Sequence, residues 1–156
     1  MKTIQINRWW RKYGGCDTGQ ALIETAFAAA LFVPLLLGAV ELARLTYAAI
    51  EVSNAAKAAV QYGSQTSATA TDTIGITNAA KGEAANLTSL TVTSVARTCV
   101  CSDGSTSTCA NTDCANSHIE ETLIVNTQAT VTPFAHVPGL PTTFTLKGRA
   151  AQRVLQ

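Results

Sequence analysis

An acidic side chain and a potential cleavage point lie together at the start of the most apolar segment of the chain. Glu24 directly precedes the uncharged stretch from Thr25 to Val40, and Gly19 stands five residues before it. A charge near the centre of a bilayer costs about 2.5–3.5 kcal/mol, and less near the interface. Cutting the chain after Gly19 would release the α-amino group of Gln20, a positive partner for Glu24. Gly19, Gln20 and Glu24 are therefore the candidate functional residues.

A second chemical feature is a cluster of cysteines downstream of the apolar stretch. Its members are Cys99, Cys101, Cys109 and Cys114, whereas Cys16 precedes the potential cut. An even number of cysteines beyond a membrane segment indicates disulfides in an oxidising compartment. Four cysteines allow three pairings. We expect the nested one, Cys101–Cys109 inside Cys99–Cys114, because an antiparallel hairpin brings its arms together in that order.

Zinc is the alternative for this cluster, with His118 as a further ligand. The C-x-C spacing differs from the C-x₂₋₄-C pattern typical of structural zinc, and the compartment favours oxidation. We therefore predict no metal site. His136, which lies between prolines, has no evident partner.

The sequence shows no enzymatic constellation. It contains no nucleophile elbow, phosphate-binding glycine loop or HExxH motif. Glu120 and Glu121 are adjacent, so a strand would point them to opposite faces, and we expect one or both to be solvated. We predict no catalytic residue, no cofactor and no small-molecule substrate. The formal net charge is +1, and no basic block lies outside the N-terminus, so no nucleic-acid partner is expected either.

The N-terminal elements must position the candidate residues. Residues 1–18 carry Lys2, Arg8, Arg11 and Lys12 against a single acid, which predicts a cytoplasmic N-terminus. The uncharged stretch is sixteen residues long, and flanking apolar residues extend it to the ~20 that a bilayer needs. The alternative is a secretory signal that is cleaved near Ala43 or Ala48.

The helical pattern continues past the apolar stretch to Tyr62. Small and apolar residues recur at helical spacing and predict a buried stripe: Gly38, Leu42, Leu45, Ala49, Val52, Ala56 and Ala59. The opposite, polar face would carry Arg44, Glu51, Asn54 and Gln61. Gly63 is expected to cap the helix, and Pro34 to kink or loosen it. A helix from Gln20 to Tyr62 would be roughly 60–65 Å long, about twice the thickness of a bilayer core, so its outer half must pack on a domain.

The remaining sequence predicts an α+β domain. A short second helix, capped by Asp72 or Thr73, would run through Ile76 and Ala80 to Leu87. Alternating patterns predict strands around residues 90–93, 123–131 and from 144 onward, with turns at Pro133 and Pro138-Gly139. The outer half of the first helix would cover the apolar face of this antiparallel sheet. The expected division is a leader (1–19), a transmembrane helix half (20–43) and an extracytoplasmic domain (44–156).

The run Gly19-Gln20-Ala21-Leu22-Ile23-Glu24, followed by a long apolar helix, resembles the processing site of class III (type IV-like) prepilins. Together with the Pro-Leu-rich run that ends at Glu41, it is similar to the N-terminus of TadE-like pilus-assembly pseudopilins. Thr25 departs from the aromatic or aliphatic residue common in that family.

This resemblance implies a minor pilin or pseudopilin of a tight-adherence (Flp-type) pilus. A prepilin peptidase would cut after Gly19, and Glu24 would pair with the Gln20 amine, preferably that of a neighbouring subunit. The expected partners are other pilin subunits, the peptidase and the inner membrane, with the C-terminal domain on the periplasmic or extracellular side. The alternatives are a type II secretion pseudopilin and a secreted or membrane-tethered, disulfide-stabilised binding module.

Overall fold

The computed structural model describes residues 17–110, 112–134, 139 and 141–155. The elements in chain order are α1 (Asp17–Gly63), the 3₁₀ helix η2 (Thr69–Thr71), α2 (Thr73–Glu83), β1 (Thr91–Cys101), β2 (Thr106–Ser107), β3 (Ile119–Val131) and β4 (Phe144–Arg153). The chain divides into two compact units, Met1–Val40 and Glu41–Gln156, and α1 contributes to both.

The described part of the first unit is the N-terminal portion of α1. Its residues from Gly19 to Val40 are all exposed. From Gly19 onward α1 is long and apolar enough to cross a membrane, by length and composition, with a mean hydropathy of 2.1 over a span-length window. The helix begins at Asp17 and continues through Pro34. The Gly19–Gln20 bond therefore lies inside the helix, in its first turn.

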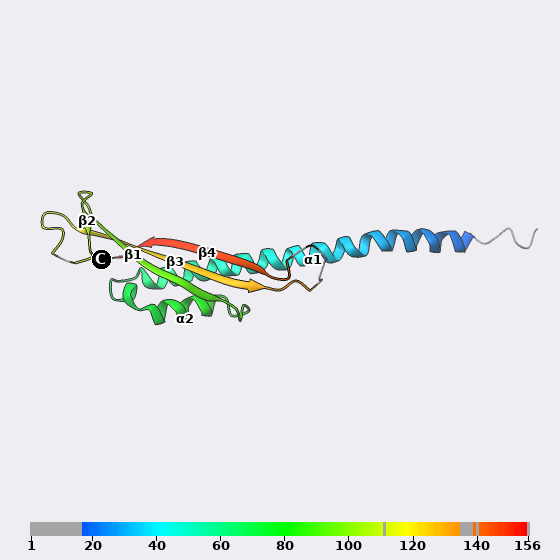
Figure 1. Cartoon of the computed structure of the whole chain (residues 1–156), viewed down its shortest axis with the longest axis horizontal. Coiled ribbons are helices and arrows are strands. Elements are labelled where there is room, and N and C mark those ends of the chain that lie inside the picture. The colour runs from blue at the N-terminus through cyan, green and yellow to red at the C-terminus, as the bar shows by residue number, and fades with distance from the viewer. Residues whose placement is uncertain (1–16, 111, 135–138, 140, 156) are drawn as a thin grey trace, which may run out of the picture. The chain divides into compact units, whose positions relative to one another are not determined.

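The second unit is an antiparallel sheet that is covered on one face by helices. Its strand order is β2-β1-β3-β4, and the C-terminal portion of α1 lies against it together with α2 (Figure 1). The register runs from Thr91 opposite Gln128 to Cys101 opposite Ile119, which leaves β3 in the middle of the long strands. The α+β class, the long first helix and the short second helix are confirmed. The two-residue strand β2 was not predicted.

Small residues let α1 approach the sheet closely. Its buried positions include Val52, Ala55, Ala56 and Ala59, each with 0% exposure. On β4, a Cβ at Gly148 would lie 2.5 Å from the carbonyl oxygen of Val52. The Thr127 hydroxyl on β3 donates a hydrogen bond to that same oxygen at 2.8 Å. The helix backbone itself therefore contacts the sheet, which only a glycine on β4 permits.

The buried stripe predicted on α1 is confirmed at its C-terminal end, but its N-terminal positions are not buried as predicted. Val52 is buried, but Leu42 is 66% exposed. Glu51, predicted on the polar face, is only 9% exposed, and its carboxylate accepts a hydrogen bond from Asn86 Nδ2 at 2.9 Å. Gly38 and Ala49, also in that stripe, are exposed. An alanine-rich helix has weak periodicity, so its partners in the tertiary structure decide which face is buried.

The two predictions about helix ends fared differently. Asp72 caps α2 as expected, because its carboxylate accepts the backbone N–H of Gly75 at 2.9 Å, but α2 ends at Glu83 rather than near Leu87. Gly63 is the last residue of α1, yet its φ is not positive, so it is not a left-handed cap. A Cβ there would overlap Leu123 Cδ2. The glycine is needed for space against β3 rather than for its backbone conformation.

Candidate functional site

The residues predicted for processing and assembly lie on the exposed N-terminal portion of α1. Gly19, Gln20 and Glu24 are all exposed, and a Cβ at Gly19 would have nothing within 4 Å. The one side-chain hydrogen bond close by is from the Thr25 hydroxyl to the carbonyl oxygen of Ala21, at 2.7 Å. Across the described residues, no side chain forms a hydrogen bond or ion pair with Glu24. Within the part of the chain that the structure describes, its carboxylate therefore has no partner.

The surroundings of Glu24 are apolar on every side of the helix. Between residues 19 and 40 the large apolar side chains are between half and three-quarters exposed, from 53% for Val33 to 76% for Phe27. Soluble core helices and signal sequences have similar composition, but a core helix is buried and this segment is not. A helix that is apolar all round requires lipid or other apolar helices about it. In that environment an unpaired carboxylate is unfavourable, and a cationic partner relieves the penalty.

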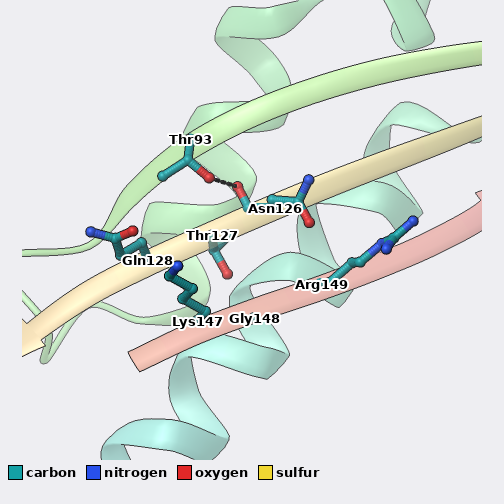
Figure 2. Close-up of a pocket in the computed structure, with 7 residues that line it drawn as sticks. All are labelled: Thr93, Asn126, Thr127, Gln128, Lys147, Gly148 and Arg149. Atoms are coloured by element: carbon teal, nitrogen blue, oxygen red, sulfur yellow. Dashed lines mark hydrogen bonds between the residues drawn. The ribbon is translucent and has the colours of Figure 1, made fainter. Parts of the chain in front are cut away.

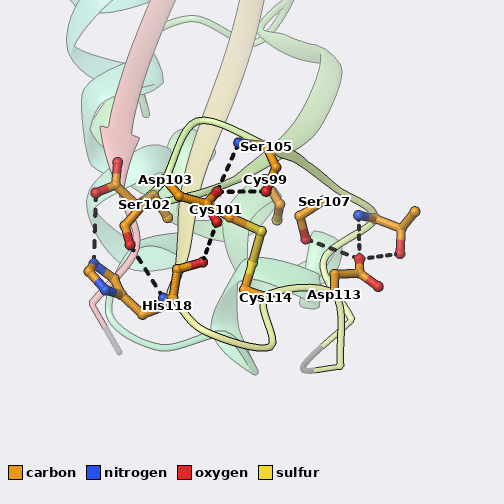
Figure 3. Close-up of a disulfide and its surroundings, with 12 residues drawn as sticks. Cys99, Cys101, Ser102, Asp103, Ser105, Ser107, Asp113, Cys114 and His118 are labelled. Carbon is orange, nitrogen blue, oxygen red and sulfur yellow. Dashed lines mark hydrogen bonds and ion pairs between the residues drawn. A yellow bond between two sulfur atoms is a disulfide. The ribbon is translucent and has the colours of Figure 1, made fainter.

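The four downstream cysteines form two disulfides at one end of the sheet. Figure 3 shows the one between Cys101 and Cys114. Cys99 pairs with Cys109, and Cys101 pairs with Cys114, with Cα–Cα distances of 5.3 and 5.6 Å. The pairing is interleaved, and the nested pairing expected from the sequence is wrong. All four sulfur atoms are in disulfides, so none is a thiolate available to zinc in this structure.

The strand register explains why the nested pairing fails. Cys99 on β1 lies opposite Ser107 on β2. Continuing that register places Cys101 opposite Ser105, four residues before Cys109 and therefore about 13 Å from it along a strand. Cys109 instead lies two residues past the partner of Cys99, where its positive φ of 72° turns the chain back. Cys114 approaches Cys101 because β3 begins opposite Cys101, at Ile119.

Two aspartates organise the disulfide-bonded loop. Asp103 accepts hydrogen bonds from the Ser105 hydroxyl at 2.6 Å and the Ser105 backbone N–H at 3.0 Å. Asp113 accepts from the Thr108 hydroxyl at 2.7 Å and the Thr108 N–H at 2.6 Å. These bonds favour the charged form and hold the pKa of both carboxyl groups below the usual range for aspartate. Both carboxylates are committed to loop structure, so neither is suited to be a general acid.

The adjacent glutamates at the start of β3 point to opposite faces, as predicted. Glu121 is only 3% exposed, and Arg97 Nε contacts its carboxylate at 2.5 Å. Glu120 is partly exposed and forms ion pairs with Arg153 and with His118, the latter at 3.8 Å. Glu120 therefore meets the expectation that at least one of the two is solvated, whereas Glu121 is buried and has a cationic partner on β1. His118 is 69% exposed, and His136 lies outside the described residues.

The outer face of the sheet has an open depression of about 410 Å³. Figure 2 shows that Thr93, Asn126 and Gln128 lie around it with Lys147 and Arg149 of β4. These side chains are hydroxyls, amides and cations. Because none is an acid or a nucleophile with a base beside it, the depression offers a polar contact surface rather than a reaction centre.

A group of contacts that no sequence pattern indicated ties α1 to the segment after β3. The guanidinium group of Arg44 stacks over the Phe134 ring, 3.7 Å from its centroid, and donates to the carbonyl oxygen of Thr132 at 3.2 Å. The Glu41 carboxylate pairs with Arg44 at 3.4 Å and accepts the Phe134 N–H at 3.3 Å. The sequence identified Glu41 only as the end of the Pro-Leu-rich run and Arg44 only as a polar-face residue. We call these four residues the Arg44 cluster.

Comparison with known proteins identifies one region of similarity. Residues 19–61 match the model of the TadE-like protein family. This confirms the resemblance over a segment that contains Gly19, Gln20 and Glu24. The exposed apolar helix and the pilus-related family together fit a membrane-anchored protein. Searches of curated proteins and of solved structures found no match.

Proposed function

We propose that this chain is a TadE-like minor pilin or pseudopilin that takes part in assembly of a tight-adherence (Flp-type IVb) pilus. One observation carries the proposal. Within the segment that matches the family, Glu24 lies exposed on a helix that is apolar all round, and no described residue of its own chain pairs with it. A cationic partner from another molecule would remove the penalty of the unpaired charge.

Processing supplies that partner. A prepilin peptidase cuts after Gly19, and the new α-amino group of Gln20 becomes the N-terminus of the mature chain. We assign the pairing to Glu24 of one subunit and the Gln20 amine of its neighbour. This ion pair forms only when the two helices are in register. The pairing of Glu24 with the Gln20 amine therefore stabilises correctly aligned subunits over misaligned ones.

The proposed topology follows from the same helix. The basic N-terminus stays in the cytoplasm, α1 crosses the inner membrane, and residues 44–156 lie on the periplasmic or extracellular side. Two disulfides in this domain are consistent with an oxidising compartment. Assembly brings the chain into contact with other pilin subunits through α1.

The contacts of α1 argue against cleavage as a secretory signal. A cut near Ala43 would remove Glu41, and a cut near Ala48 would also remove Arg44. Both residues hold the segment after β3, so either cut would break the Arg44 cluster. A pilin retains the whole helix and with it these contacts.

The mature N-terminus tests processing directly. Mass spectrometry of the protein from its native membrane should find a chain that begins at Gln20. Gly19→Leu should abolish this cut and leave a precursor that migrates more slowly. Gly38→Leu is the matched control, because Gly38 is also an exposed α1 glycine, and a Cβ there would have nothing within 4 Å. A mature start between residues 43 and 50 would instead support a secreted binding module.

Substitution of Glu24 tests its role in assembly. Glu24→Ala should leave membrane insertion and cleavage intact but reduce surface pili, counted by electron microscopy, by at least ten-fold. Glu24→Gln should also fail, because the amide cannot replace the charge. Thr25→Ala, which removes only the hydroxyl bond to Ala21, should assemble normally. Normal piliation with Glu24→Ala would contradict the proposed pairing. A strain that lacks this protein gives a further test. If it still makes normal pili but no longer secretes proteins, the result would support a type II secretion pseudopilin.

A further inference from the structure

The Arg44 cluster holds an exposed aromatic ring in a fixed place. Phe134 is 81% exposed, yet its backbone N–H is bound by Glu41 and its ring is covered on one side by the Arg44 guanidinium group. Single exposed apolar residues on a protein surface are common and need no explanation. This one differs because two interactions with α1, and a third between Arg44 and the nearby Thr132, fix its position while most of the ring stays open to the surroundings.

The cluster lies at the boundary of the apolar segment. Glu41 directly follows Val40, the last residue of the uncharged stretch, and α1 is unbroken between them. At 1.5 Å per residue, Arg44 lies about 6 Å along the helix from Val40. The interfacial region on each side of a bilayer is about 5–7 Å thick. If the hydrocarbon core ends near Val40, Arg44 lies at the level of the lipid headgroups.

The chemistry of the cluster suits that level. Phe, Trp and Leu form the apolar faces that enter the boundary between headgroups and acyl chains, and arginine keeps its charge near the phosphates while its stem contacts apolar groups. Leu42 and Tyr47, on neighbouring turns of α1, are also 66% and 60% exposed. The sequence that follows Phe134, up to residue 146, contains no acidic residue that would repel anionic headgroups.

We propose that the segment from Thr132 to Phe134 is a second membrane contact, in which the Phe134 ring enters the headgroup region of the bilayer that α1 crosses. Arg44, which is ion-paired with Glu41, positions the ring. This proposal rests on the membrane span in the proposed function. The contact gives the domain a fixed orientation on the outer leaflet before assembly, because a single helix alone would let it rotate and tilt.

Depth-dependent fluorescence quenching tests the contact. The full chain, with Trp9→Phe and Trp10→Phe, is reconstituted in phosphatidylcholine–phosphatidylglycerol nanodiscs that contain lipids with a nitroxide on the headgroup. Phe134→Trp should lose at least half of its emission. Val100→Trp is the matched control: Val100 is 40% exposed at the opposite end of the sheet, and its emission should not change. Arg44→Ala should reduce the quenching of Phe134→Trp at least two-fold.

A tryptophan in the span separates the two proposals. Phe32→Trp should be quenched by lipids brominated on the acyl chains. If Phe32→Trp is quenched but Phe134→Trp is quenched no more than Val100→Trp, the second contact is overturned. The membrane span would still stand. Absence of quenching for Phe32→Trp would instead refute the membrane span, and the second contact with it.

Discussion

The close approach of α1 to β4 makes Gly148 sensitive to substitution. In Gly148→Ala the new methyl group would lie 2.5 Å from the Val52 carbonyl oxygen and 2.6 Å from Thr127 Oγ1. One of these neighbours is helix backbone and cannot rotate away. Overpacking of this kind costs about 1–3 kcal/mol, and loss of the Thr127–Val52 hydrogen bond about 0.5–1.5 kcal/mol more. We expect the free energy of unfolding to fall by about 2–4 kcal/mol.

The measurement is urea unfolding of the full chain in detergent micelles, followed by hydrogen exchange of the β3 amides. With a urea dependence of about 1–3 kcal/mol per molar, the midpoint should drop by about 0.7–4 M. The control is Gly82→Ala, because Gly82 lies within α2 and has nothing within 4 Å of a Cβ. It should raise stability by about 0.5–1 kcal/mol. If Gly148→Ala were as harmless as Gly82→Ala, the helix backbone would not contact β4 as described.

Three further predictions concern the sheet and its disulfide-bonded end. The lowered pKa of Asp113 means that its hydrogen bonds to Thr108 and Ser107 contribute stability that is fully present above about pH 4 and is lost as the pH falls through the native-state pKa. Acid unfolding of the wild type between about pH 5 and pH 2 should therefore be steeper than that of Asp113→Asn; identical profiles would disprove the contribution. Arg97→Leu leaves the Glu121 carboxylate buried without its partner and should destabilise the chain by about 2–4 kcal/mol in urea, whereas adding Glu121→Leu should recover more than half of the loss. Mass spectrometry of a non-reduced digest should find Cys101 linked to Cys114, and a Cys101–Cys109 peptide would contradict the described register.

Much of the fold follows from local patterns in the sequence. A strand alternates its side chains between two faces, so the period of two from Leu123 to Val131 predicts β3 and its buried face without knowledge of any other segment. Asp72 caps α2 through a bond to a residue only three positions away. The uncharged stretch up to Val40 is apolar whatever its neighbours are. In each case the deciding interaction is short in sequence.

The site residues divide in the same way. Glu24 and Gly19 could be proposed from the sequence because an acid and a glycine at a fixed spacing stand out against an apolar background. The Arg44 cluster was missed because Glu41 and Phe134 are 93 residues apart. No local sequence pattern around either residue predicts that the two are in contact. The only sequence signal was an aromatic residue in a loop that has no acidic neighbour.

The sequence by itself determined that a long apolar helix precedes an antiparallel sheet with oxidised cysteines, because hydrophobic periodicity and composition act residue by residue. The tertiary structure alone decided that Glu51 is buried while Leu42 is exposed, and that the disulfides interleave. The faces of an alanine-rich helix differ little in hydrophobicity, and the sequence does not specify which cysteines pair. Both choices therefore depend on the register between strands and helix, which is fixed only when distant segments pack together.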